Sequence, residues 1–317
     1  MIPLITSIIA ITLSAGTSLV YATIGEIYTE RSGILNLGIE GMMLMSAVTA
    51  FATAFHTGSL LLAVLMAMLV GMLLALIHAF LSITMHANQV VSGLSITLFG
   101  TGLASFLGQR LGPESNGFNL SGMSAVKFTR LQVEGLGDIP LLGAVFNQDP
   151  LTYIVYLLIP VAWYFMYKTK FGLNLRSVGE NPQTADAMGL NVTKIRYLYT
   201  IFGGMLVGIG GAHLSLAYTP GWSENITGGR GWIVIALVIF SMWNPSRAIL
   251  GAILFGGINA VQFRLQASGT DIPSAYLNMA PYVATILVLV LVTVWESHNR
   301  KVGPPAALGT SYMREDK

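Results

Sequence analysis

The chain has 317 residues, of which 54% are hydrophobic and only 9% are charged, and its formal net charge is +2. So few charged side chains cannot cover a soluble surface, and the mean hydropathy is +0.68. The small net charge gives no sign of a nucleic-acid partner, and the absence of cysteine excludes disulfides, thiolate metal sites and thiol catalysis. The composition therefore predicts an all-α, polytopic membrane protein surrounded by lipid.

Apolar runs near the length that crosses a bilayer recur along the chain. The run 231–243 is too short to cross about 30 Å of hydrocarbon at about 1.5 Å per residue. It ends at Asn244-Pro245, so we expect a broken or tilted helix that continues into the next run. The first run has no basic flank and no small-residue cleavage site, which favours a retained span over a signal peptide. The nine predicted spans are 2–24, 34–55, 60–82, 91–108, 151–167, 197–217, 231–243, 246–263 and 277–295.

Basic residues predict which side of the membrane each loop occupies. They cluster around one loop and follow the last run, at Lys168, Lys170, Arg176, Lys194, Arg196, Arg300 and Lys301. A transmembrane domain over 1–299 with a cytoplasmic coupling loop at 169–196 and a cytoplasmic tail at 300–317 is therefore expected. Counting spans backwards places the N-terminus and 109–150 outside, the latter as an ordered external loop or cap without a span of its own.

The polar segment 171–197 contains the signals of a short helix. Asn181 suits the N-cap, Pro182 the first helical position and Gly189 a left-handed stop, which together specify about two turns. On a cytoplasmic loop such a helix is either a docking element for a partner or a connector that only orders the loop.

Charged and amide groups stand beside glycines in the segment from Glu26 to Met43. This pattern predicts a discontinuous helix whose backbone faces a cavity and not lipid. Glu40 would either line or gate a translocation pathway, or be neutralised by an internal ion pair or by a proton. Asn36 is as well suited to bracing a helix as to meeting a substrate.

Small residues recur every fourth position at Gly204, Gly208 and Ala212, which predicts a helix face that another backbone can approach closely. The face is either a sliding surface or a static packing surface. The sequence alone does not separate the two.

Three ordered motifs carry a family resemblance: Glu30 to Met43, Ser177 to Pro182 with Ala185 to Gly189, and Gly228 to Trp232 with Ala236 and Asn244-Pro245. Over about residues 15 to 295 the chain resembles the permease subunits of bacterial ABC importers for branched-chain amino acids, simple sugars and nucleosides, and most closely the nucleoside branch. The resemblance implies a bundle of about nine to ten spans, some broken, of the type II ABC importer kind. It also implies a multi-pass protein of the bacterial cytoplasmic (inner) membrane.

The resemblance further implies the partners and the coupling site. The partners would be a cytoplasmic ABC ATPase, a second permease that forms a heterodimer with this chain, and an external solute-binding protein or lipoprotein. The coupling helix would fall on Glu180, Asn181, Pro182, Thr184, Ala185, Asp186, Ala187, Met188 and Gly189. The chain has no Gly-x-x-x-x-Gly-Lys-Ser/Thr loop, so we expect no cofactor on this chain, no enzymatic activity of its own, and ATP hydrolysis by partner subunits.

Neither a catalytic set nor a metal-ligand spacing is apparent, and the five scattered histidines suit packing or interface roles, with His213 the one that merits a test. A nucleoside pathway needs aromatic faces and a few amides or hydroxyls. The candidates are Asn36, Gly38, Glu40, Asn88, Gln89, Trp232, Asn259 and Gln262.

Other cargoes and mechanisms stay open. A simple sugar or a vitamin fits the same family, whereas a branched-chain amino acid would require a carboxylate-binding group that we do not find. An ion-coupled secondary transporter would require ionisable residues at the bilayer midplane, for which Glu40 and His213 are a small supply.

Overall fold

The computed structural model describes residues 2–111, 125–137, 139–269, 273–298 and 303–313. Within these ranges the regular secondary structure is helical, and no strand occurs. Two π-helical segments, η1 (Phe80–Thr84) and η3 (Leu214–Tyr218), extend α3 and α9. The α-helices are α1 (Ile2–Arg31), α2 (Ile39–Thr57), α3 (Leu60–Ala79), α4 (Gln89–Arg110), α5 (Gly143–Phe146), α6 (Pro150–Lys168), α7 (Lys170–Glu180), α8 (Pro182–Ala187), α9 (Val192–His213), α10 (Arg230–Phe240), α11 (Pro245–Ala267) and α12 (Ser274–His298).

The predicted all-α, membrane-spanning bundle is confirmed. In the described part of the chain, seven helical stretches are long and apolar enough to cross a membrane. They are Ile5–Arg31, Ile39–Thr57, Leu60–Thr84, Gln89–Arg110, Pro150–Lys168, Val192–Tyr218 and Pro245–Ala267. Shorter apolar helices occupy Arg230–Phe240 and Ala275–Val288, so each of the nine predicted runs corresponds to a helix.

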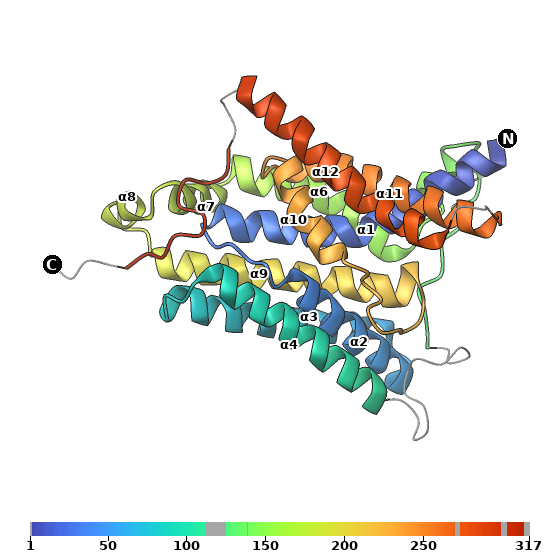
Figure 1. Cartoon of the computed structure of the whole chain (residues 1–317), viewed down its shortest axis with the longest axis horizontal. Helices are drawn as coiled ribbons and strands as arrows, with labels where there is room; N and C mark the ends of the chain where they lie inside the picture. The colour runs from blue at the N-terminus through green and yellow to red at the C-terminus, as the bar shows by residue number, and fades with distance from the viewer. Residues whose placement is uncertain (1, 112–124, 138, 270–272, 299–302, 314–317) are drawn as a thin grey trace.

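The long helices run along the length of the molecule (Figure 1). The start of α1 and the described residues between α4 and α6 (125–137 and 139–149) lie at one end, where the Leu141 amide donates to Thr6 Oγ1 at 3.3 Å. Helices α7 and α8 and the segment 303–313 lie at the other end. The two ends therefore group the segments that the charge distribution predicts to be external and cytoplasmic; of the predicted external loop, 112–124 and 138 lie outside the described residues.

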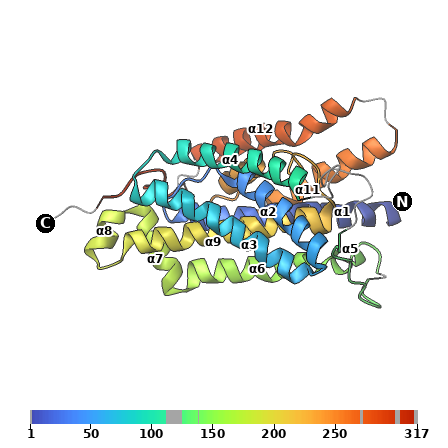
Figure 2. The same cartoon turned by 90° about the horizontal axis from the view of Figure 1, so that it is seen from below.

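Helices α1, α2 and α9 form the centre of the bundle, and the view in Figure 2 shows α3, α4, α6 and α12 around them. The apolar windows of α1 and α9 are 78% and 72% buried, compared with 28% for the span that contains α3. The outer helices expose leucines such as Leu61 and Leu98. Such apolar surface suits lipid or a partner membrane subunit.

Helices α3 and α9 cross where Gly71 and Gly204 face each other. A Cβ added to Gly71 would lie 2.2 Å from the Gly204 carbonyl oxygen, and one added to Gly204 would lie 2.5 Å from that of Gly71. Gly208 approaches the Ala67 carbonyl oxygen in the same way, at 2.4 Å. The predicted close approach of backbones on this face is confirmed; the sliding interpretation stays a prediction.

Two predicted boundaries are wrong. Helix α1 continues to Arg31, beyond the predicted end at 24. Its last turns, after residue 24, are buried among other helices, where polar partners replace lipid. The chain is then non-helical over residues 32–38, which we call the link, and α2 begins at Ile39. The predicted discontinuity therefore lies between two helices and not within one.

Helix α10 is short, as predicted, but it does not continue into α11. Met242 and Trp243 adopt positive φ values of 53° and 54°, and Asn244 caps α11 by accepting from the Ser246 amide at 3.1 Å. The chain reverses at this turn, which brings Gly251 of α11 beside Leu237 of α10. Two consecutive left-handed residues redirect the backbone in a way that hydropathy does not reveal.

Candidate functional site

The link has no helix to satisfy its backbone, and side chains of neighbouring helices do so instead. Gln89 Oε1 accepts from the Leu35 amide at 2.7 Å, and His78 Nε2 lies 3.1 Å from the Leu35 carbonyl oxygen. Thr97 Oγ1 donates to the Leu37 carbonyl oxygen at 2.8 Å. Because an unsatisfied backbone group costs several kcal/mol in hydrocarbon, these partners allow an irregular segment to exist among the spans.

Asn36 anchors the middle of the link to α1. Its Nδ2 donates to Glu26 Oε2 at 3.2 Å, and its backbone amide donates to Glu26 Oε1 at 3.3 Å. Its own Oδ1 accepts from the Gly38 amide at 2.9 Å. Of the two roles that the sequence left open for Asn36, the geometry favours the brace. Gly38 packs against Ile96, where an added Cβ would lie 3.0 Å from Cγ2.

The Glu40 carboxylate binds the start of α10. It accepts from Thr227 Oγ1 at 2.5 Å, from the Gly229 amide at 3.0 Å and from the Gly231 amide at 2.6 Å. A helix N-terminus carries partial positive charge and free amides, so it stabilises a buried carboxylate. The second residue of α2 therefore caps a helix that begins about 190 residues later.

The far end of α10 is held by the last turn of α1. Trp243 Nε1 donates to Glu30 Oε2, and Arg31 donates to the Trp243 carbonyl oxygen at 3.2 Å and to that of Met242 at 3.4 Å. All four side chains are buried. Glu40 and the end of α1 thus fix both ends of the short helix.

The remaining pathway candidates have different surroundings. Asn88 is exposed and caps α4 by accepting from the amides of Val90 and Val91. Asn259 donates to the Phe255 carbonyl oxygen within α11, and Gln262 is buried on the same helix. Trp232 is 40% exposed on α10, which lies beside α12 in Figure 1. The structure brings Asn36, Gly38 and Gln89 together at the link, and it places Glu40 against the start of α10. Trp232 is the aromatic candidate, and it faces outward.

The candidates from the sequence omitted several residues of this network. Glu26, His78, Thr97 and Thr227 are buried and satisfy the irregular segments. Their signal in the sequence was a polar side chain inside or beside an apolar run, which marks an internal and not a lipid-facing position. Arg230 is another polar residue beside an apolar run that takes an internal position. It donates to the Ala15 carbonyl oxygen at 3.1 Å and lies over the Tyr218 ring.

His213 pairs with an acidic residue at the end of the bundle opposite α8. Its Nε2 lies 3.3 Å from Asp149 Oδ2, and both side chains are buried. Asp149 also caps α6 by accepting from the amides of Leu151 and Thr152. This contact joins α6 to α9 and gives His213 the interface role that the sequence favoured.

The predicted short helix is confirmed as α8. Asn181 Oδ1 accepts from the Thr184 amide at 2.9 Å, Pro182 is the first residue, and Gly189 has a φ of 85°. The segment before it is helix α7 and not the loop we predicted. Thr169 caps α7 by accepting from the Gly172 amide at 3.2 Å, and the buried residues of one face fix it against the bundle.

Helix α8 has one buried and one exposed side. Ala185 is 3% exposed and packs with Val178 and Val192, whereas Ala187 is exposed and Met188 is 80% exposed. Ala187 and Met188 therefore form the outward surface of the predicted coupling segment.

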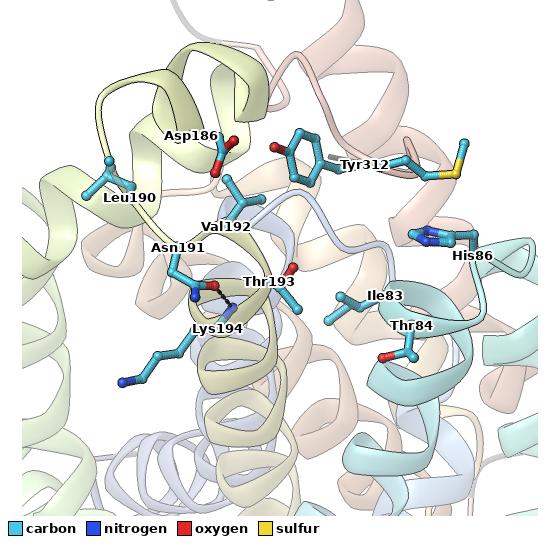
Figure 3. A pocket seen from close by; sticks show the side chains of 12 residues that line it. Ile83, Thr84, His86, Asp186, Leu190, Asn191, Val192, Thr193, Lys194 and Tyr312 are labelled. Atoms are coloured by element: carbon cyan, nitrogen blue, oxygen red, sulfur yellow. Dashed lines mark hydrogen bonds between the residues drawn. The ribbon is translucent and has the colours of Figure 1, made fainter. Parts of the chain in front are cut away.

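An open pocket of about 820 Å³ lies beside α8 (Figure 3). Its walls come from the end of α3, the turn between α8 and α9, and the C-terminal segment, with Thr84, His86, Asp186, Lys194 and Tyr312 among its polar side chains. The Asn191 side chain, on one wall, caps α9 by accepting from the Lys194 amide at 2.8 Å. The pocket and α8 give this end of the bundle a shaped, polar surface outside the apolar spans.

Comparison with known proteins identifies the family. Residues 8–295 match the family described as branched-chain amino acid transport system / permease component. The chain belongs to this permease family. It is thus a multi-pass membrane protein and a permease subunit of an ABC transporter, in agreement with its apolar helices.

Three relatives cover nearly the whole permease. A candidate glucose ABC transporter permease of Haloferax volcanii, TsgC13, is 39% identical over 96% of this chain and 96% of its own length. The guanosine ABC transporter permease NupQ of Bacillus subtilis is 34% identical over 91% and 92%. The nucleoside ABC transporter permease NupC of Lactococcus lactis subsp. cremoris is 35% identical over 97% and 96%.

Proposed function

We propose that this permease moves nucleosides into the cell through an ATP-driven, binding-protein-dependent importer. Two relatives that align over more than nine-tenths of the chain are named for guanosine and for nucleoside transport, which supports this cargo. The proposal places the protein in the cytoplasmic membrane, with its α8 end inside.

The observation that carries the coupling mechanism is the exposed side of α8. A rigid helix with capped ends, a buried Ala185 and an outward Ala187 and Met188 can transmit force between a bound partner and the spans that adjoin it. The turn 188–191 joins it directly to α9, one of the central helices. A cytoplasmic ATPase bound to this side would move α9 without touching the membrane core.

The energy source in this proposal is external to the chain. The sequence lacks the Gly-x-x-x-x-Gly-Lys-Ser/Thr loop that cradles nucleotide phosphates, so the partner ATPase hydrolyses ATP and this permease binds no cofactor. A second permease, in a heterodimer, would complete the pathway, and an external binding protein or lipoprotein would deliver the solute.

The pathway would lie on the face that carries α10. Trp232 offers an aromatic surface for a nucleobase there, while Glu40 and the last turn of α1 hold α10 in place behind it. In this proposal Glu40, Asn36 and Gln89 position the pathway, and Trp232 contacts the solute.

A sugar is the second candidate cargo, because the Haloferax volcanii relative named for glucose is 39% identical. A sugar presents hydroxyls and only a small C–H face to an aromatic ring, so it would gain less from Trp232 than a nucleobase does. Trp232→Ala should therefore reduce uptake more if the cargo is a nucleoside than if it is a sugar.

The deciding experiment is uptake into proteoliposomes that contain the permease with its ATPase, second permease and binding protein. We expect ATP-dependent accumulation of labelled guanosine that exceeds that of glucose and that stops when the phosphate-binding lysine of the ATPase is replaced. Glucose uptake that exceeds guanosine uptake would establish the sugar alternative. Uptake driven by an ion gradient without ATP would overturn the importer proposal.

A further inference from the structure

The C-terminal segment 303–313, which we call the strap, is bound to three parts of the bundle at the α8 end. The Ala307 amide donates to the Gly179 carbonyl oxygen at 2.9 Å, and the Gly309 amide donates to that of Gly33 at 3.1 Å. Arg196 Nη1 donates to the Thr310 carbonyl oxygen at 3.1 Å. The strap therefore joins α7, the link and α9, which are far apart in the sequence.

The strap also packs against these parts. Ala307 is 7% exposed, and the Ala306 amide donates to Glu180 Oε2 at 3.3 Å. Gly179 packs so closely on the end of α1 that an added Cβ would lie 2.1 Å from the Arg31 carbonyl oxygen, and it would touch Pro305 of the strap at 3.4 Å.

The end of the strap reaches α8 itself. Tyr312 packs against the cluster of Val178, Ala185 and Val192, which contains the buried side of α8. Figure 3 shows its ring above Val192, on the side of the pocket that faces Asp186. The strap thus extends from the first residues of the link to the helix that we propose as the docking element.

We propose that the strap makes α7, α8 and the start of the link one mechanical unit, so that a displacement of α8 by the ATPase reaches the link and, through it, Glu40 and α10. This inference rests on the proposed function. The physical reason is that Gly33 and Gly179 are both held by backbone amides of one short segment, so α7 cannot move away from Gly33 without breaking these hydrogen bonds. Gly33 is the second residue of the link, and α2, which follows the link, carries Glu40, the residue that caps α10.

Two neighbouring alanines of the strap offer a matched test. Ala307→Leu places a larger side chain in a buried contact and should lift the strap from Gly179, whereas Ala306 is exposed, so Ala306→Leu leaves the contact intact. Both variants are measured in proteoliposomes for ATP hydrolysis, for solute uptake and for co-purification of the ATPase. A third variant ends the chain at residue 302.

We expect Ala307→Leu and the truncated chain to retain the ATPase and to hydrolyse ATP, but to transport about threefold to tenfold less solute per ATP, the range that the net loss of about one hydrogen bond produces in a two-state equilibrium. Ala306→Leu should keep the wild-type ratio. If the truncated chain does not accumulate in membranes, the comparison of Ala307→Leu with Ala306→Leu decides whether the strap transmits the displacement.

Unchanged uptake per ATP in Ala307→Leu would overturn the role of the strap while leaving the proposed function intact. Loss of the ATPase from Ala307→Leu would make the strap a docking element and would also overturn its role in transmission. Absence of ATP-driven uptake by the wild-type complex would instead refute the proposed function on which the inference rests.

Discussion

The Glu40 carboxylate accepts a hydrogen bond from the Gly231 amide at 2.6 Å, although the two residues are 191 positions apart. Gly231 allows this approach because an added Cβ would lie 2.4 Å from the Glu40 backbone nitrogen. The contact fastens the start of α2 to the start of α10, each of which follows a non-helical segment. It makes the position of α10 depend on one buried carboxylate.

Glu40→Gln should lower both stability and uptake. The amide keeps one acceptor oxygen but turns an NH₂ group toward amides that also donate, so we expect a loss of about 1–3 kcal/mol, typical of a hydrogen bond to a charged group. Thermal unfolding in detergent and uptake in proteoliposomes measure the two effects. The control is Glu224→Gln, because Glu224 is exposed. A Glu40→Gln protein with wild-type melting temperature and uptake would refute the role of Glu40 as the cap of α10.

Gly71→Ala should destabilise the crossing of α3 and α9. The new methyl group would meet the Gly204 carbonyl oxygen, and overpacking of this kind costs about 1–3 kcal/mol, more than the gain of up to about 1 kcal/mol in helix propensity. Gly102→Ala on α4 is the control, since nothing lies within 4 Å of its added Cβ. The melting temperature should fall for the first variant and stay or rise for the second. Equal melting temperatures would argue against a close contact in the membrane.

Ala187→Arg should weaken binding of the ATPase and leave the membrane domain folded. The side chain is exposed on the outward side of α8, where a bulky charge would block close packing of a partner. Ala185→Arg provides the contrast, because it would put a charge into the cluster of Val178 and Val192 and reduce the yield of folded protein. Co-purification of the ATPase and gel filtration separate the outcomes. Normal ATPase binding and uptake by Ala187→Arg would reduce α8 to a connector.

Thr184→Cys and Thr129→Cys should react with an impermeant thiol reagent from opposite sides of the membrane. Both threonines are exposed and lie at opposite ends of the bundle, and the chain has no cysteine of its own. In intact cells the basic α7–α8 end should be protected, so Thr129→Cys is labelled and Thr184→Cys is not. The reverse pattern of labelling would invert the topology.

Asp149→Ala should cost more stability than Asp149→Asn. Both variants remove the carboxylate partner of His213, but asparagine still caps α6, whereas alanine also removes the cap, worth about 0.5–2 kcal/mol. Thermal unfolding of the two variants gives the comparison. Equal losses would show that the cap contributes nothing and that the pair with His213 accounts for the whole effect.

Properties that depend on near neighbours in the chain were predictable from the sequence. Apolar runs located the spans because crossing a bilayer requires about 20 apolar residues in succession. Asn181, Pro182 and Gly189 located α8 because capping involves residues within one turn. The spacing of Gly204 and Gly208 indicated a close contact, although the sequence did not name Gly71 as the partner.

Only the tertiary structure decided what the buried polar residues do. Glu40 has the same sequence environment whether it gates a pathway, pairs with a cation or caps a helix, and its partners Thr227 and Gly231 lie in a distant segment. The strap is a further case, since a short uncharged segment with no helical pattern becomes part of the bundle through the carbonyl oxygens of Gly33 and Gly179. Hydropathy and capping depend on residues that are close in the sequence, so the sequence reveals them. A hydrogen bond between remote segments forms only when packing has brought its donor and acceptor together.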